Sequence, residues 1–250
     1  MKISIITVVW NNKETIQDAI ESVLQQTYKD IEYIIVDGGS TDGTVEVIES
    51  YGKKIDQFIS EPDKGLYDAM NKGIKLATGD IIGILNSDDF YINKDVISVI
   101  SKSFEQHKVN SLFADLVYVN PNNLDKVVRR YSSANFHPNK FALGWMPAHP
   151  TFFVTKACYK KFGLYKTDYR IAADYELLTR FLFHHKISYY YLNKTIIKMR
   201  MGGISTQNLK SNWILNKEII RACSENGIKT NMFKISLKYF KKVFELIGNK

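Results

Sequence analysis

Blocks of apolar residues alternate with polar segments along the first half of the chain, and their spacing changes from block to block. Three short runs rich in β-branched residues predict strands buried on both faces, at residues 2–9, 32–36 and 81–85. Between and after these runs, apolar residues recur every three or four positions, which predicts helices at residues 13–26, 45–51, 66–77 and 94–106. This alternation is typical of an α/β fold, in which helices pack on the faces of a sheet.

The second half of the chain has a less regular pattern. It predicts strands at residues 111–120, 126–131, 152–155 and 188–192, and loops at residues 136–150 and 199–207. It predicts helices at residues 174–183, 209–226 and 232–247. No internal repeat or low-complexity linker interrupts the sequence, so the pattern shows no sign of two independent domains.

An acidic turn follows the predicted strand at residues 81–85. Its residues are Asn86, Ser87, Asp88 and Asp89. Two adjacent carboxylates repel each other and lose hydration on burial unless a cation lies between them and a partner. Mg²⁺ and Mn²⁺ take oxygen ligands of this kind and often share them with a substrate phosphate. The same composition is also common in solvated turns, so both interpretations remain open.

A second predicted strand also ends in a carboxylate, Asp37, which is followed by the glycines Gly38 and Gly39. Strands joined through a helix run parallel, so Asp37 and the acidic turn are expected at one edge of the sheet. Ligands collect at this edge, which favours a nucleotide cleft over two unrelated helix caps. Asp37 suits the base or the ribose, since a carboxylate accepts hydrogen bonds from ring N–H groups and sugar hydroxyls.

Composition narrows the class of protein only slightly. The formal charge of +8 indicates an anionic partner, such as a nucleotide, a nucleic acid or a lipid surface, but a Lys-rich composition can also reflect the source genome. Cys158 and Cys223 are too few for a disulfide framework and lack metal-ligand spacing. No apolar run approaches the roughly 20 residues that cross a bilayer, and the first ten residues are too short for a signal core, so we predict a cytoplasmic protein.

Four segments in fixed order carry a family resemblance. They are TVVWN (residues 7–11), VDGGSTDGT (36–44), DKGLYDAMNKG (63–73) and NSDD (86–89). Together they resemble the inverting family 2 glycosyltransferases with the GT-A fold, particularly bacterial enzymes that build capsule, exopolysaccharide or lipopolysaccharide. The resemblance implies a catalytic domain at residues 1–205 with a Rossmann-like, nucleotide-binding central mixed sheet flanked by helices, followed by a C-terminal helical tail at residues 206–250. The ordered set is far more specific than any one motif.

The resemblance also implies roles for individual residues on the donor side. Thr7 and Asp37 would hold the uracil of a UDP-sugar, Asp88 would contact the ribose, and Asp89 would bind Mn²⁺ or Mg²⁺. Since the acidic motif occurs as an adjacent pair, which carboxylate touches the metal stays open. The other residues implied in donor binding are Val9, Asn11, Lys64, Asp68 and Asn86.

A later segment, AADYELL at residues 172–178, resembles the part of the family that supplies the catalytic base. Helical spacing places Asp174 on the same inward stripe as Leu177, Leu178 and Phe181, whereas Glu176 points away and can pair with Arg180. We therefore predict Asp174 as the base. Helix capping also explains an aspartate at this position, and the two roles can coexist.

Two loops and the tail complete the candidates. The resemblance places His149 near the acceptor and the diphosphate, although a structural loop histidine explains it equally well. A glycine-bearing loop at residues 201–205 is either a cover for the donor phosphates or a simple turn. The tail at residues 232–247 is basic and amphipathic, which predicts either contact with an anionic membrane surface or packing on the domain.

These features together predict a metal-dependent inverting glycosyltransferase that moves a sugar from a nucleotide donor to a saccharide or lipid-linked acceptor. The expected donor is a UDP-sugar. The enzyme would work in the cytoplasm or at the inner face of the cell membrane. The alternative is a sugar-phosphate nucleotidyltransferase, although these enzymes usually carry a glycine-rich basic loop where Trp10, Asn11 and Asn12 stand. A nucleic acid is not expected as partner, because the acidic pair would repel its phosphates.

Overall fold

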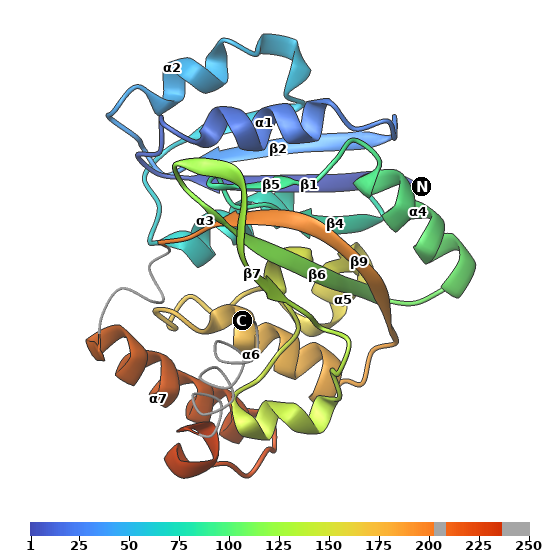
Figure 1. The fold of residues 1–250 in the computed structure, drawn as a ribbon, viewed down its shortest axis with the longest axis vertical. Coiled ribbons are helices and arrows are strands. Elements are labelled where there is room, and N and C mark those ends of the chain that lie inside the picture. Colours follow the sequence, from blue (N-terminus) through green and yellow to red (C-terminus); the bar gives the residue numbers. More distant parts are fainter. Residues whose placement is uncertain (203–208, 237–250) are drawn as a thin grey trace.

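A mixed sheet of nine strands forms the centre of the protein in the computed structural model, which describes residues 1–202 and 209–236 (Figure 1). The strands are β1 (Ile3–Val9), β2 (Ile31–Asp37), β3 (Gln57–Ser60), β4 (Ile81–Ile84), β5 (Asp89–Tyr91), β6 (Ser111–Asn120), β7 (Asn123–Tyr131), β8 (Phe153–Thr155) and β9 (Tyr189–Arg200). Their order across the sheet is β3-β2-β1-β4-β8-β6-β9-β5, and β7 pairs with β6 outside this path. The α/β architecture and the mixed sheet were both predicted from the sequence.

Helices cover both faces of the sheet. The α-helices are α1 (Ile16–Leu24), α2 (Thr44–Glu49), α3 (Leu66–Leu76), α4 (Val96–His107), α5 (Lys156–Phe162), α6 (Ala173–Thr179) and α7 (Leu209–Glu225). The shorter helical segments are η1 (Gly52–Lys54), η2 (Pro138–Leu143), η3 (His149–Thr151) and the π-helical turn η4 (Arg180–His184). In the ranges described, no helix combines the length and the apolar character that crossing a membrane requires.

The alternation of side chains along β1 explains how one sheet supports two cores. Ile6 and Val8 belong to the hydrophobic cluster that includes buried residues of α3, α6 and α7. Ile5 and Val9 belong to the cluster that includes buried residues of α1 and α4. Successive residues of a strand point to opposite faces of the sheet. A strand whose residues do not alternate between apolar and polar is therefore expected to be covered on both faces, as predicted for β1.

Strand direction places the candidate site. β1 pairs in parallel with both β2 and β4, and β2 pairs in parallel with β3. The carboxyl ends of β1, β2 and β4 therefore lie at the same edge, which confirms the expectation drawn from the two acidic strand ends. β8 is antiparallel to β4 and β6, and β9 is antiparallel to β5, so the sheet is mixed beyond β4.

The main differences from the prediction concern three short elements and the length of β9. β3, β5 and α5 were not predicted, because each is short and has no long apolar period of its own. β9 continues to Arg200, whereas the polar residues after Leu192 predicted its end there. Pairing with β6 and β5 satisfies the backbone of this stretch and overrides its polar composition.

The C-terminal segment is part of the same core. Ile219, Ala222 and Cys223 of α7 and the later residues Ile228 and Ile235 join the cluster that contains the buried residues of α6. Residues 232–236 are helical, as predicted for the start of the helix at 232–247. The rest of that helix, and residues 203–208 of the loops predicted at 199–207 and 201–205, lie outside the described residues.

A buried carboxylate at the amino end of the sheet makes stability depend on pH. Burial would raise the pKa of Glu32, but hydrogen bonds from Ser4, Thr78 and Lys2 lower it to about 2. A carboxylate with a lowered pKa stabilises the fold above its unfolded pKa, and this contribution is lost as the pH falls towards 2.

We expect the wild type to lose about 2 kcal/mol from this residue between pH 5 and pH 2. In Glu32→Gln this part of the pH dependence should vanish, as measured by urea unfolding at a series of pH values. The exposed Glu14, replaced by glutamine, is the matched control. An unchanged pH dependence in Glu32→Gln would contradict the assignment.

Candidate active site

Three loops at the carboxyl edge of the sheet are joined by side-chain hydrogen bonds. After β1, the backbone N–H of Asn11 donates to the Ser40 hydroxyl at 2.7 Å, and the Asn11 side-chain oxygen accepts from the N–H of Thr41 at 2.8 Å. Asn12 donates to the hydroxyl of Ser87 in the acidic turn at 2.9 Å. Asn11 has φ +47°, a left-handed conformation that asparagine tolerates better than most residues. The ends of β1, β2 and β4 therefore form one continuous surface.

Asp37 shapes the loop after β2. Its side chain is fully buried, and Oδ2 accepts hydrogen bonds from the N–H groups of Gly39 at 3.0 Å and Ser40 at 2.9 Å and from the Ser60 hydroxyl at 2.7 Å. Oδ1 accepts from the Ser40 hydroxyl. Both oxygens thus bind the protein's own donors, and the role of Asp37 in binding a base or ribose stays a prediction.

The two residues of β1 that were predicted to bind the donor are buried, whereas the residue that follows the strand is exposed. Thr7 and Val9 are buried, and the Thr7 hydroxyl lies 3.1 Å from the phenol oxygen of Tyr33 inside the core. The next residue after the strand, Trp10, is 67% exposed. An exposed indole at the ligand-binding edge of a sheet offers a stacking surface for a base. Trp10 lies inside the first motif but was not predicted as a site residue.

Lys64 and Asp68 lie at the start of α3. Lys64 is exposed, and its backbone N–H, which precedes the helix, donates to the Asp68 carboxylate in the first turn of α3 at 3.1 Å. The ammonium of Lys72 also lies 3.9 Å from Asp68. The Asp68 side chain therefore orients the loop that carries Lys64, whose charged group is left at the surface.

The acidic turn contains the most unusual polar group of the protein. Asp89 is fully buried, and its Oδ2 accepts a hydrogen bond from the side chain of Asn86 at 3.1 Å. Its Oδ1 is buried too and has no hydrogen-bond partner among the residues that the structure describes. Burial and the neighbouring Asp88 charge raise the pKa of Asp89 well above the usual range, and burial also raises the pKa of Asp88. A buried acceptor without a partner is destabilising unless something binds it.

The acidic turn fits a divalent cation, as the unpartnered carboxylate oxygen indicates. No group of three or more His, Cys, Asp or Glu side chains within residues 1–202 and 209–236 is placed to hold a metal by itself. Asp88 and Asp89 would therefore be one part of the ligand set, with substrate phosphate oxygens and water as the rest. This division is common for Mg²⁺ and Mn²⁺, which often bind through one or two carboxylates and a substrate phosphate.

Arg200, at the end of β9, braces the acidic turn and was not predicted as a site residue. Its guanidinium donates to the backbone carbonyl of Asp88 at 2.6 Å and to the carboxylate of Asp18 on α1. Its Cζ lies 5.0 Å from the ring centroid of Phe90, and the residue is only 8% exposed. The sequence places Arg200 in a segment predicted as a loop, so the pairing of β9 with β5 was the missing information.

His149 and Asp174, which are 25 positions apart in the chain, meet in the structure. Nδ1 of His149 lies 3.1 Å from Oδ2 of Asp174, and their side chains are 34% and 14% exposed. Oδ1 of Asp174 accepts from the N–H of Tyr175 at 2.7 Å. An imidazole next to a carboxylate holds that carboxylate in one orientation and can share its proton. The structure thus brings together two residues that the sequence analysis treated separately.

The predicted orientation of the Asp174 helix is wrong in one respect. Glu176, predicted to point away from the core, is fully buried, whereas Asp174, predicted on the inward stripe, keeps 14% of its side chain exposed. The predicted pairing of Glu176 with Arg180 is confirmed, with Nε of Arg180 3.0 Å from the carboxylate. Because α6 also packs against α7, helical spacing alone could not separate the two carboxylates.

Two buried hydroxyls fix the loop that carries His149. The Ser133 hydroxyl donates to the carbonyl of Ala114 on β6 and accepts from the N–H of Ala148. The Thr151 hydroxyl accepts from the N–H of Ala114 and lies within hydrogen-bond distance of the Ala114 and Ala148 carbonyls. His149 lies between these anchors, so its ring is held by the sheet rather than by a free loop.

Tyr67 on α3 connects the donor side to the Asp174 side. Its hydroxyl donates to the carbonyl of Ile171, which immediately precedes α6. Burial, and then the nearby charge of Asp174, raise the pKa of Tyr67. α3 begins at the Lys64 loop, so one helix contacts both groups of predicted site residues.

Comparison with known protein families identifies the architecture. The family described as Glycosyl transferase family 2 matches residues 4–164. An uncharacterised glycosyltransferase of Rickettsia typhi is 32% identical over 234 residues, which cover 87% of this chain and 70% of the relative. A PGL/p-HBAD biosynthesis glycosyltransferase of Mycobacterium bovis is 26% identical over 222 residues, covering 87% of this chain and 82% of the relative.

Solved structures show the same fold at low sequence identity. S. aureus TarS residues 1–349 in complex with UDP-GlcNAc match with a TM-score of 0.70 and 17% identity over 92% of this chain and 68% of that one. A longer TarS chain matches with a TM-score of 0.69, and there this protein spans only 41% of its length. The mannosyltransferase PcManGT from Pyrobaculum calidifontis in complex with GDP-Man and Mn²⁺ matches with a TM-score of 0.62, 14% identity and coverage of 98% and 80%. These likenesses confirm the predicted GT-A fold.

Proposed function

The chain belongs to glycosyltransferase family 2, and from this premise we propose that it transfers a sugar from a nucleotide donor to a saccharide or lipid-linked acceptor, with inversion and with help from Mn²⁺ or Mg²⁺. The observation that carries the proposal is the buried Oδ1 of Asp89, which has no partner within residues 1–202 and 209–236 and lies in a turn bonded to the loop after β1. A cation bound there would lie where a nucleoside diphosphate meets this edge of the sheet.

The nucleotide is proposed to be uridine-based. Trp10, directly after β1, supplies an exposed aromatic face for the base, and Thr7 and Asp37 are buried in the neighbouring strands β1 and β2. The proposal draws support from TarS, whose structures contain UDP and UDP-GlcNAc, whereas PcManGT contains GDP-Man. A guanosine donor is thus the alternative to be tested in parallel.

The proposed transfer is a single displacement. An acceptor hydroxyl attacks the anomeric carbon, its proton passes to Asp174, and the bond between that carbon and the diphosphate oxygen breaks, so the nucleoside diphosphate leaves. His149 holds Asp174 through the 3.1 Å contact and orients its carboxylate. A divalent cation bound at Asp88 and Asp89 would supply charge neutralisation for the departing diphosphate. Arg200 keeps the acidic turn in place.

An assay of the released product tests the reaction class. Incubation with a panel of UDP- and GDP-sugars, Mn²⁺ and polyprenyl-linked acceptors is expected to release a nucleoside diphosphate only when donor and acceptor are both present. Release of pyrophosphate from UTP and a sugar phosphate would instead establish the rival nucleotidyltransferase. Neither product under any combination would reject both.

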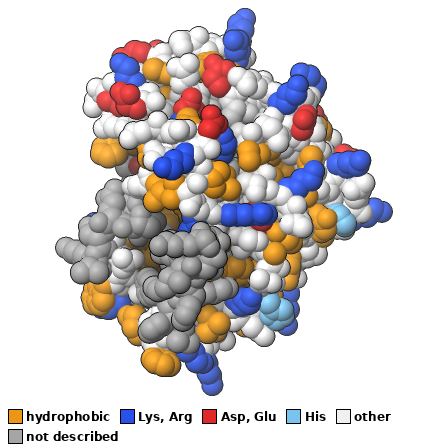
Figure 2. Space-filling model, in the orientation of Figure 1, with side chains coloured by type: hydrophobic (Ala, Val, Ile, Leu, Met, Phe, Trp, Pro, Cys, Tyr) orange, Lys and Arg blue, Asp and Glu red, His pale blue; other side chains and the backbone are white. Residues whose placement is uncertain are grey.

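The acceptor is proposed to be an intermediate of surface polysaccharide, presented at the inner face of the cell membrane. Basic side chains are scattered over the face shown in Figure 2, while acidic ones gather in its upper part, over α1 and α2. A nucleic acid is not proposed as a partner, because the acidic pair Asp88 and Asp89 would repel its phosphates. Location in the cytoplasm remains part of the same proposal.

The start of the C-terminal tail, at residues 230–235, has one side chain suited to packing on the domain and another suited to contact with a membrane surface. Ile235 is fully buried and the Thr230 hydroxyl donates to the carbonyl of Ala142, so this part packs on the domain. Phe233 is 75% exposed and lies beside Lys234. An exposed aromatic residue next to a lysine is suited to the interface of an anionic bilayer.

We expect Phe233→Glu to reduce sedimentation with liposomes of anionic lipid at least about threefold, because it replaces an inserting ring by a like charge. The control is Val127→Glu, which makes the same charge change on the exposed strand β7. Equal binding by the wild type and both variants would remove membrane contact from the proposal and leave packing as the role of this segment.

A further inference from the structure

We propose that Glu218 on α7 is a positioning residue for the catalytic base, acting through the loop that leads into α6. This inference rests on the proposed function, because it concerns the same Asp174. The α5–α6 loop is defined here as residues 163–172, between the end of α5 and the first residue of α6. Asp174 is the second residue of α6, so the last residues of this loop determine where its carboxylate lies.

One carboxylate holds three consecutive backbone groups at the end of the α5–α6 loop. Glu218 accepts hydrogen bonds from the N–H groups of Arg170 at 2.7 Å, Ile171 at 2.8 Å and Ala172 at 2.8 Å. N–H groups that precede a helix have no partner inside the helix and must be satisfied from elsewhere. Bonds to an ionised acceptor are shorter and stronger than bonds to a neutral one. Glu218 therefore fixes the backbone immediately before the base.

The same stretch is held from a second side by the donor half of the site. Tyr67 on α3 donates to the carbonyl of Ile171, while the N–H of Ile171 donates to Glu218. The two polar groups of one peptide segment are thus bound by residues that are 151 positions apart in the chain. Side chains from α3 and α7 clamp the loop between them, and Asp174 follows three positions later.

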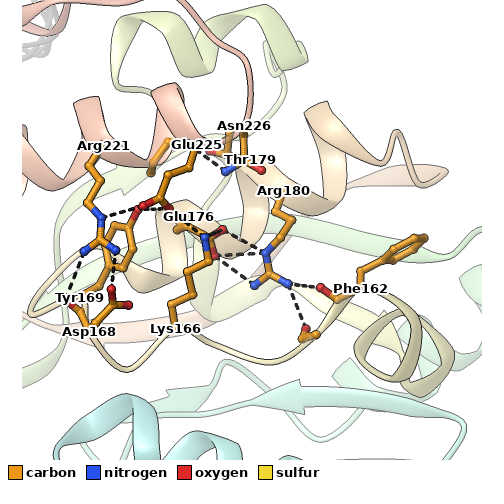
Figure 3. A network of polar contacts seen from close by, with 12 residues as sticks. Phe162, Lys166, Asp168, Tyr169, Glu176, Thr179, Arg180, Arg221, Glu225 and Asn226 are labelled. Atoms are coloured by element: carbon orange, nitrogen blue, oxygen red, sulfur yellow. Dashed lines mark hydrogen bonds and ion pairs between the residues drawn. The ribbon is translucent and has the colours of Figure 1, made fainter.

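Further contacts make α7 the support of the whole α5–α6 loop. Figure 3 shows Arg221 and Glu225 of α7 reaching Asp168, Tyr169 and Lys166 of this loop. Glu225 accepts from the Tyr169 hydroxyl and from Lys166, both at 2.8 Å. Burial would raise the pKa of Glu225, but these bonds and the one from Arg221 lower it to about 2.

The two α7 carboxylates act on different parts of the loop. Glu225 binds the side chains of Lys166 and Tyr169, whereas Glu218 binds main-chain N–H groups two to four positions before Asp174. Loss of Glu225 removes ion pairs at the surface and leaves the backbone bonds in place. Loss of Glu218 frees the backbone itself. A displacement of about 1 Å at a reacting group can cost about 100-fold in rate.

The test uses the full chain and compares Glu218→Gln with Glu225→Gln, which makes the same chemical change on the same helix. In Glu218→Gln we expect kcat to fall about 30-fold to 100-fold, while the donor KM and UDP affinity stay within about twofold. Amide hydrogen exchange in a peptide spanning residues 165–173 should accelerate. In Glu225→Gln we expect kcat within about threefold of the wild type and a lower melting temperature.

The variant Glu218→Asp distinguishes a positioning role from a general loss of folding. It keeps the carboxylate charge but has a side chain that is shorter by one methylene group. We expect its kcat to lie between those of the wild type and Glu218→Gln. A kcat within twofold of the wild type in Glu218→Gln would overturn the proposal, as would a parallel loss of UDP binding in both Glu218 variants. If the wild type transfers no sugar, the proposed function fails, whereas the hydrogen-exchange result still decides whether Glu218 clamps the loop.

Discussion

Replacing Asp174 with asparagine is expected to lower kcat about a thousandfold while leaving the affinity for the nucleotide donor within about twofold of the wild type. Asparagine keeps the size of the side chain and an oxygen next to Nδ1 of His149, 3.1 Å away in the wild type, but it cannot accept a proton from the acceptor hydroxyl. The measurements are steady-state release of nucleoside diphosphate and calorimetric titration with the donor. A variant that transfers sugar at more than about a tenth of the wild-type rate would show that Asp174 is not the base.

The matched variant for Asp174→Asn is His149→Ala. The imidazole touches Asp174 but lies on a loop anchored to β6 by Ser133 and Thr151, so its removal leaves the base in place with one partner fewer. We expect a smaller loss of kcat, about 10-fold to 100-fold. If His149→Ala is instead more damaging than Asp174→Asn, the imidazole rather than the carboxylate takes the proton.

The first half of the fold could be predicted because local pattern and tertiary environment agree there. The β1 segment is mostly apolar and is buried on both faces, and the helix after it shows one apolar face. β5 could not be predicted in this way, since its three residues become a strand only through pairing with β9. β9 itself continues through a polar stretch because β6 and β5 lie on either side of it.

The candidate site was predictable as a set of residues but not as an arrangement. Motif order indicated Asp37, Asp88, Asp89 and Asp174, and strand direction explains why the first three share one edge. The contact between His149 and Asp174 depends on how a 3₁₀ turn and a helix pack, which no spacing in the sequence encodes. Glu218, in a helix that the pattern predicted correctly, was not recognised, because its partners are backbone groups and carry no sequence signature.

Single side chains link the loops that carry the predicted site residues. Tyr67 joins the helix after the Lys64 loop to the α5–α6 loop, and Arg200 joins the acidic turn to the end of β9. Asn12 joins the turn to the loop after β1. Variants of these linking residues should therefore change the geometry of the site without removing a group that touches substrate. Separate measurements of kcat and KM distinguish them from variants of the residues that do touch substrate.

Replacing Asp89 with asparagine is expected to have opposite effects on stability and on donor binding. The Asp89 carboxylate is fully buried beside Asp88, and its Oδ1 has no partner within the described part of the chain, so a negative charge there is destabilising without a cation. The amide carries no charge, so the metal-free variant should melt at a higher temperature than the metal-free wild type. Because it loses a carboxylate ligand, its Mn²⁺-dependent affinity for the donor should fall at least about 100-fold.

Asp88→Asn is the control, since the Asp88 side chain is half-buried and has less to gain from losing its charge. We expect little change in its metal-free melting temperature, which differential scanning calorimetry would measure beside a Mn²⁺ titration of donor binding. An unaltered titration in Asp89→Asn would show that the cation binds elsewhere. A metal-free melting temperature below that of the wild type would show that the buried carboxylate stabilises the fold on its own, and the unpartnered oxygen would then no longer indicate a cation site.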